Sequence, residues 1–194
     1  MVKLTVDGKM YTQPLTLKMD LRIKTPLPDL RKQFEMELNC VMGINESFET
    51  LVQVGSVRAQ LKERAAKAGQ GALADAIANL DKKAAEIEGA SQVAFFGLPP
   101  SGKQPENLST LNQHFGGILA VADSADTAPT TQAAAVYNEL VDSLRSLLSR
   151  WQQLRDFELT SVNAELKKAR LASIDPNKAP EAAPSADGDG DDEP

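Results

Sequence analysis

The sequence predicts a mainly α-helical protein: an antiparallel bundle of about four helices, two of them long, with a short N-terminal β-hairpin and a disordered acidic C-terminal tail. Apolar residues repeat with a period near 3.6 from Pro26 to Arg170, whereas a period of two runs through residues 2–19. Residues 177–194 contain no apolar side chain larger than Ala or Pro, so they cannot bury enough surface to offset the entropy of ordering. These patterns divide the chain into a hairpin (1–24), a helical bundle (25–172) and a tail (173–194).

The first 19 residues predict the hairpin. Apolar and polar residues alternate over Val2–Val6, and Asp7-Gly8 follows, which favours a type I′ turn because both turn positions need a positive φ. The return strand is expected over Met10–Met19, bulged or at a sheet edge at Pro14, which has no N–H to donate. A two-stranded hairpin alone is marginal in water, so these strands are typical of the remaining part of a larger sheet.

The first helix is expected between Thr25 and Gly69. Thr25 is a candidate N-cap, Pro26 is allowed at the first helical position, and a glycine after Lys67 is typical of a helix end. An apolar stripe with helical spacing is expected to face the core, and it contains Leu30, Phe34, Leu38, Val41, Phe48, Val52, Leu61 and Ala65.

Three further helices complete the predicted bundle. The second runs to Gly89, and the third covers residues 108–122 after a Pro/Gly-rich loop at 90–107. The fourth begins near Pro129 and continues to Leu166, and some 40 residues would span ~60 Å if the helix were unbroken. Helices two and three together match the length of one long helix, which suits an antiparallel bundle.

Charge and composition exclude several classes of function. Residues 175–194 hold seven acidic side chains and one lysine, so the net charge of −6 belongs to this end and the rest of the chain is neutral. A neutral body gives no electrostatic footprint for nucleic acid. No apolar run approaches the ~20 residues that span a bilayer, and the N-terminal residues lack the apolar stretch of a signal peptide. With one Cys and one His, we expect no internal disulfide, no His/Cys metal site and no cofactor.

One segment, Gly97–Lys103, fits the phosphate-binding pattern GxxxxGK. A P-loop donates backbone N–H groups to phosphates and places Ser or Thr after the lysine to hold Mg²⁺. Here Gln104 occupies that position, and Pro99 and Pro100 have no N–H to give. We therefore expect a loop that connects two helices, with nucleotide binding as a remote alternative.

No catalytic residue is assigned from the sequence. Cys40 and the one histidine, His114, lie on different predicted helices, so Cys40 is expected to be a small buried hydrophobe and His114 a residue of a polar face. Trp151 falls on the apolar stripe of the last helix, which favours a core or interface anchor over a ligand-stacking platform. The carboxylate pairs do not stand out from solvated helix faces. Those faces mix both charges, which favours packing between helices over binding to a lipid surface.

Parts of the chain resemble a known family. Residues 4–20, LTVDGKMYTQPLTLKMD, and the following Arg22-Ile-Lys24 resemble the end of a β-sandwich in large bacterial proteins with BNR-repeat, sortilin-like β-propellers, often labelled glycosyl hydrolases or sialidase-like. Leu21 departs from the family, which tends to have Pro there. The resemblance implies an exported parent protein and transfers no catalytic residue, because any such residue would lie upstream. Helical stretches at 51–69, 72–90, 128–140 and 149–171 are also similar, so the likeness covers roughly residues 2–172.

These observations predict a non-catalytic helical interaction or scaffolding module from the C-terminus of a propeller-type protein. Its partner is expected to be protein, either an upstream propeller or sandwich region or a second copy of this chain, with an exposed strand available for β-augmentation. The alternatives are an accessory fragment of a glycan-processing, sialidase-like propeller enzyme and, more remotely, lipid or ligand binding in the bundle. The candidate interface residues are Val2, Leu4, Val6, Tyr11 and Trp151.

Overall fold

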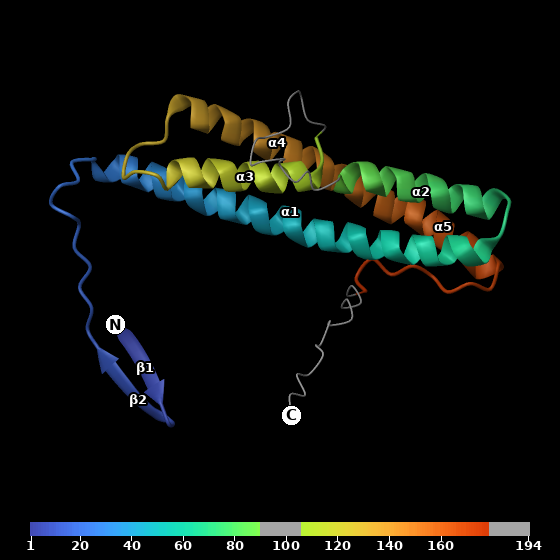
Figure 1. Ribbon diagram of the computed structural model, residues 1–194, viewed down its shortest axis with the longest axis horizontal. Coiled ribbons are helices and arrows are strands. Elements are labelled where there is room, and N and C mark those ends of the chain that lie inside the picture. The colour runs from blue at the N-terminus through green and yellow to red at the C-terminus, as the bar shows by residue number, and fades with distance from the viewer. Residues whose placement is uncertain (90–105, 179–194) are drawn as a thin grey trace, which may run out of the picture.

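The computed structural model describes residues 1–89 and 106–178 (Figure 1). It confirms the predicted fold class, a mainly helical protein with a short hairpin at the N-terminus. The elements in chain order are β1 (Val2–Val6), β2 (Lys9–Gln13), α1 (Leu27–Ala68), α2 (Ala72–Glu88), α3 (Leu108–Ala122), α4 (Thr131–Gln153), the π-helical segment η2 (Leu154–Leu159) and α5 (Thr160–Lys168).

The helices form three rods (Figure 1). The first rod is α1, which runs the length of the bundle. The second consists of α2 and α3, which follow each other end to end and run antiparallel to α1. The third consists of α4, η2 and α5, which run parallel to α1. The prediction that two shorter helices together match a long one is therefore confirmed.

The core lies where the three rods meet. Trp151 from α4 is 3% exposed, and its indole Nε1 donates to Oε1 of Gln53 on α1 over 3.3 Å, as expected for a buried tryptophan whose N–H needs an acceptor. The large side chains with less than 2% exposure come from all three rods: Leu61, Ile77, Leu80, Ile87, Leu108, Phe115, Leu147 and Leu166.

The hairpin has the predicted turn. Asp7 and Gly8 have φ values of 47° and 74°, which are the two positive values that a type I′ turn needs. The predicted return strand was too long, because β2 ends at Gln13, directly before Pro14, and not at Met19. All residues of both strands are exposed, and the hairpin contacts none of the described helices.

Of the apolar stripe predicted for α1, Leu61 is buried as expected, but the prediction was wrong about the buried face over residues 34–52. Phe34, Leu38, Val41, Phe48 and Val52 were expected in the core, and all five are exposed. The buried face consists largely of small or polar residues spaced by three and four, namely Gln33, Met36, Cys40, Gly43, Ser47, Thr50, Val54, Val57, Leu61 and Arg64.

Close packing against α3 explains why the face of α1 with small and polar residues is the buried one. A Cβ atom on Gly43 would lie 2.9 Å from the ring of Phe115, which is fully buried. The side-chain amide of Asn112 on α3 donates to the Ile44 carbonyl (2.9 Å) and to Ser47 Oγ (2.8 Å). Because α1 presents small residues and backbone here, α3 can approach closely enough to bury its own aromatic ring.

The end of α2 and the start of α3 lie beside each other. Gly89 has a φ of 72°, and a Cβ atom there would overlap the side chain of Asn107. Asn107 caps α3 by accepting from the Thr110 N–H (2.9 Å), while Ser109 Oγ donates to the Glu88 carbonyl (2.8 Å). The chain therefore leaves α2 and enters α3 at one place. Of the predicted loop at 90–107, only residues 106 and 107 are described, so Gly97–Lys103 lies outside the described residues.

The third rod is not a continuous α-helix. Its apolar stripe steps by five residues from Leu154 to Leu159, and η2 accommodates the extra residue by its wider turn. As a result, Leu159, Val162 and Leu166 all remain on the buried side. The predicted helix from Pro129 to Leu166 is thus correct in extent, begins at Thr131, and changes to π-helix in this segment.

Residues 171–178 form a strap along α1 and α5 (Figure 1). The side chain of Asn163 exchanges two hydrogen bonds with the backbone of Ile174 (2.7 and 2.9 Å), which is 2% exposed. Gln60 does the same with the backbone of Asp175 (2.8 and 3.0 Å). The predicted boundary between bundle and tail at residue 173 is therefore corrected, since the packed part of the chain extends to Lys178; the rest of the predicted tail lies outside the described residues.

Candidate functional site

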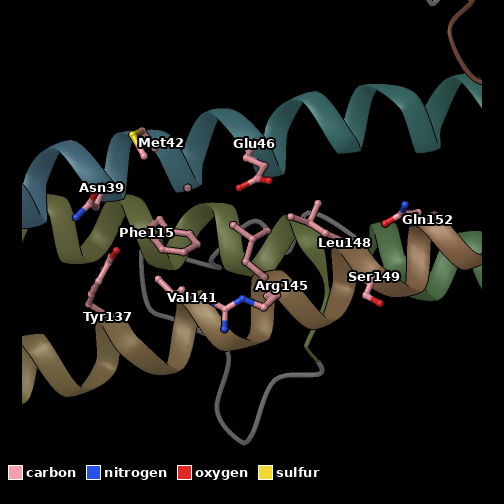
Figure 2. Close-up of a pocket in the computed structure, with 12 residues that line it drawn as sticks. Asn39, Met42, Glu46, Phe115, Tyr137, Val141, Arg145, Leu148, Ser149 and Gln152 are labelled. Carbon is pink, nitrogen blue, oxygen red and sulfur yellow. The ribbon is translucent and has the colours of Figure 1, made fainter.

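A groove opens between α1 and α4, with α3 behind it (Figure 2). Its volume is about 420 Å³. Phe115 of α3 lies between the two flanking helices and meets Tyr137 of α4 edge to face, with ring centroids 6.5 Å apart. Polar groups from α1 and α4 also line the groove: Asn39 lies near the aromatic pair, and Glu46 and Gln152 lie further along it (Figure 2).

Burial disfavours the ionised forms of two side chains near this groove, Cys40 and Tyr137. Burial, and to a lesser degree the charge of Glu37, raise the pKa of the Cys40 thiol, so the thiolate is disfavoured. Burial and the proximity of Cys40 raise the pKa of Tyr137. Arg145 is held by Asp142 at 2.9 Å. The groove therefore offers an apolar floor and hydrogen-bonding groups.

The structure does not join Cys40 and His114 into a pair. Cys40 is fully buried on α1, whereas His114 is exposed on α3. Both positions agree with the structural roles expected from the sequence. Over residues 1–89 and 106–178, no group of three or more His, Cys, Asp or Glu side chains is arranged to hold a metal ion.

A second apolar surface lies on the face of α1 opposite its buried face. Its members are spaced by seven, four or three residues in the sequence. This heptad-like spacing places them in one line along the helix. Their exposed fractions range from 37% to 62%. At 1.5 Å per residue the line is about 38 Å long. We call this surface the outer seam, and it consists of Leu27, Phe34, Leu38, Val41, Phe48 and Val52.

The outer seam spans residues 27–52, in which five acidic residues outnumber two basic ones, Arg31 and Lys32, both near its N-terminal end. Residues 33–53 contain four glutamates and no lysine or arginine. Within the described part of the chain, none of these four carboxylates has a cationic partner within ion-pair distance. Further along the same helix the situation differs, since Arg58 pairs with Asp81 (2.8 Å) and Glu88. The four unpaired residues are Glu35, Glu37, Glu46 and Glu49.

The predicted interface residues fall into two groups. The antiparallel register places Leu4 opposite Tyr11, and alternation along β1 puts Val2 and Val6 on the same face of the hairpin. These four side chains are 48–59% exposed and form an apolar face. Trp151 is separate from them, because it lies in the core.

The sequence pattern identified every member of the outer seam except Leu27, but it assigned them to the core. The signal that could have corrected it was the second, parallel line of Cys40, Gly43 and Ser47, whose small size suits a helix contact. Hydrophobicity alone favoured the line with the larger side chains.

No family model, no curated protein and no solved structure matches this chain. The resemblance to propeller-type proteins therefore remains a prediction. In the two described stretches, no helix combines the length and apolar character needed to cross a bilayer.

Proposed function

We propose that this chain is a non-catalytic helical interaction module whose binding surface is the outer seam of α1. The observation that carries this proposal is the contrast within one helix: large apolar side chains stay exposed along one face while small and polar ones are buried on the opposite face. Apolar side chains gathered on one exposed face are a feature of interaction sites.

The shape of the seam favours a protein partner over a small molecule. Sites for small ligands are concave and enclose most of the ligand, whereas the seam is a line of side chains about 38 Å long on the outside of a helix. Side chains such as Phe34 and Phe48, which reach out from a rigid helix, can act as anchors in an interface because aromatic residues bury a large area. An extended apolar element of another protein chain fits this geometry.

A second candidate function is the accessory role beside a propeller or sandwich domain. It is supported by the hairpin, whose two strands are exposed on both faces and have unpaired outer edges in the described structure. Such edges can be completed by strands of another sheet. Reading the gene upstream of this chain tests the idea: propeller repeats in the same reading frame support it, and an unrelated frame or a different domain argues against it.

In-cell photo-crosslinking tests the main proposal. A benzophenone amino acid replaces Phe48 in the outer seam of the full chain, and a matched variant carries it at Val121, which is exposed on α3 outside the seam. We expect a protein adduct from position 48 and little or none from position 121. Equal adduct yields from the two positions, or no adduct from position 48, would contradict the proposal.

A further inference from the structure

We infer that the outer seam of α1 binds the N-terminal hairpin of a second copy of this chain, so that two copies exchange their hairpins in a closed dimer. This inference rests on the proposed function, because it names the partner of the same surface. Three features of the described chain support it: an uncovered apolar face on the hairpin, opposite charge on the two surfaces, and an arm that carries the hairpin away from its own bundle.

The hairpin needs a surface to pack on. Val2, Leu4, Val6 and Tyr11 lie on one face and are 48–59% exposed. A two-stranded hairpin becomes independently stable only with further strands or against a helix. A strand of five residues is about 17 Å long, so the hairpin fits within the 38 Å of the outer seam.

The charges of the two surfaces are complementary. Residues 1–24, which form the hairpin and its arm, contain five Lys or Arg and two Asp, a net charge of +3. The stretch 27–52 that carries the seam contains five acidic and two basic residues, a net charge of −3, and both basic residues precede residue 33. Lys9 lies on the apolar face of the hairpin, opposite Val6, where it can reach a glutamate of this stretch. Complementary charges of this kind steer association and fix the orientation of the partners.

The same charges disfavour pairing of α1 with α1 of the second copy. The spacing of the seam would suit a coiled coil, and Asn45 lies in line with its apolar residues. Two such helices, however, would bring glutamates beside glutamates with no cation between them in residues 33–53. Like charges juxtaposed in an interface are costly, so the basic hairpin is the better occupant.

The arm holds the hairpin apart from the bundle of its own chain (Figure 1). Thr25 Oγ1 donates to the carbonyl of Asp126, in the turn that follows α3, and α3 covers the inner face of α1. The arm therefore starts on the side of α1 opposite the seam. Figure 1 shows the hairpin apart from the bundle at the end of this arm. A hairpin presented in this way is available to another copy.

Reciprocal exchange doubles the interface. A stable protein interface buries about 1,200–2,000 Å² in total, which is large for one hairpin of five-residue strands. A two-fold axis would make the contact twice, once for each hairpin on the seam of the other copy. Such an arrangement is closed and buries the apolar face of each hairpin and the outer seam of each copy. Assembly would therefore end at the dimer.

Disulfide trapping between two single variants tests the exchange. Full-length Leu4→Cys chain is mixed with full-length Leu38→Cys chain and oxidised; both positions are exposed, and the native Cys40 is fully buried. We expect a linked species of twice the 20.9 kDa chain mass, formed from one chain of each kind. The matched control mixes Leu4→Cys with Val121→Cys. Val121 lies outside the seam and is somewhat more exposed than Leu38 (56% against 47%), yet this mixture should link at least about tenfold less.

Two outcomes would overturn the inference. If the double variant Leu4→Cys/Leu38→Cys links within one chain and the native chain is a monomer in light scattering, the hairpin covers its own seam. If Leu38→Cys alone links to itself as efficiently as the mixture does, the helices pair directly. A charge reversal gives a further test. Lys9→Glu should raise the dimer Kd about tenfold, and adding Glu49→Lys should restore the native Kd. Misfolding would not produce this rescue, because a second substitution does not repair a misfolded chain.

The two proposals can fail separately. An adduct of position 48 with a different protein would support the interaction module and refute the hairpin exchange. No adduct at all, together with a monomeric native chain, would refute both.

Discussion

The two faces of α1 differ in a way that hydrophobicity alone does not predict. The inner face is lined by residues such as Gln33, Gly43 and Ser47, and the outer face by phenylalanine, leucine and valine. On the inner face the stabilisation comes from close packing of the two helices, because α3 places Phe115 directly over Gly43. The comparison shows that the buried face of a helix depends on how closely the neighbouring helices can pack against it. Large apolar residues that stay exposed indicate a surface that binds a partner.

The polar residues of the inner face do not weaken it, because their hydrogen bonds are satisfied. The Gln33 amide donates to the Ala122 carbonyl (2.9 Å), and Thr50 Oγ1 donates to the Glu46 carbonyl (2.9 Å). Arg64 Nε donates to the Ala172 carbonyl at 2.8 Å. Throughout the described residues, no buried side-chain nitrogen or oxygen lacks a partner. A polar inner face with complete pairing avoids the penalty of about 1–3 kcal/mol that each unpaired group would cost.

The largest expected effect comes from shortening matched leucines on the two faces. Leu61 is fully buried, so Leu61→Ala should lower the free energy of unfolding by about 2–5 kcal/mol. Leu38 is 47% exposed, so Leu38→Ala should change it by no more than about 0.5 kcal/mol. Urea unfolding at low protein concentration, where association is dispersed, measures both. Equal losses would mean that the two faces are not distinct in the folded chain.

The strap should contribute nearly as much as a core side chain. Ending the chain after Ser173 removes buried Ile174 and the backbone bonds to Asn163 and Gln60, so we expect a loss of about 2–4 kcal/mol. Ending it after Lys178 keeps these contacts and serves as the matched control. Thermal unfolding of the two shortened chains beside the full chain gives the difference. An unchanged melting temperature after the first truncation would show that the strap does not pack in solution.

A smaller effect, with opposite signs at two glycines, would sharpen the comparison further. Gly43→Ala puts a Cβ atom 2.9 Å from the Phe115 ring and should destabilise by about 1–3 kcal/mol. Gly116 lies in α3 with nothing within 4 Å of its Cβ position, so Gly116→Ala should stabilise by about 0.5–1 kcal/mol. Calorimetry of both variants measures this. If Gly43→Ala were neutral, α3 would not need the close approach.

Much of the fold followed from local chemistry. The positive φ values of Asp7-Gly8, the helix ends at Gly69 and Gly89, and the third and fourth helices all reflect rules that act over a few residues. The length of β2 was misjudged because the loss of the Pro14 donor ended the strand where a bulge was expected.

The failures concern contacts between segments distant in sequence. The buried face of α1 depends on the shape of α3, some 70 residues away, and apolar periodicity cannot report it. The strap was missed because Ile174 is an isolated apolar residue whose hydrogen-bond partners Gln60 and Asn163 lie on two helices. The acidic composition of the tail also placed the predicted end of the bundle too early in the sequence. Of the candidate site, the hairpin residues were identified correctly as exposed, and Trp151 proved to be core.

The junction of α2 and α3 has a practical consequence. Gly89 and Asn107 are neighbours in space, so the end of α2 and the start of α3 lie close together. A foreign domain with adjacent termini could be inserted there without separating the helices. Such an insertion would offer a site for a fluorescent reporter that leaves α1 untouched, and would allow assembly of the chain to be followed in living cells.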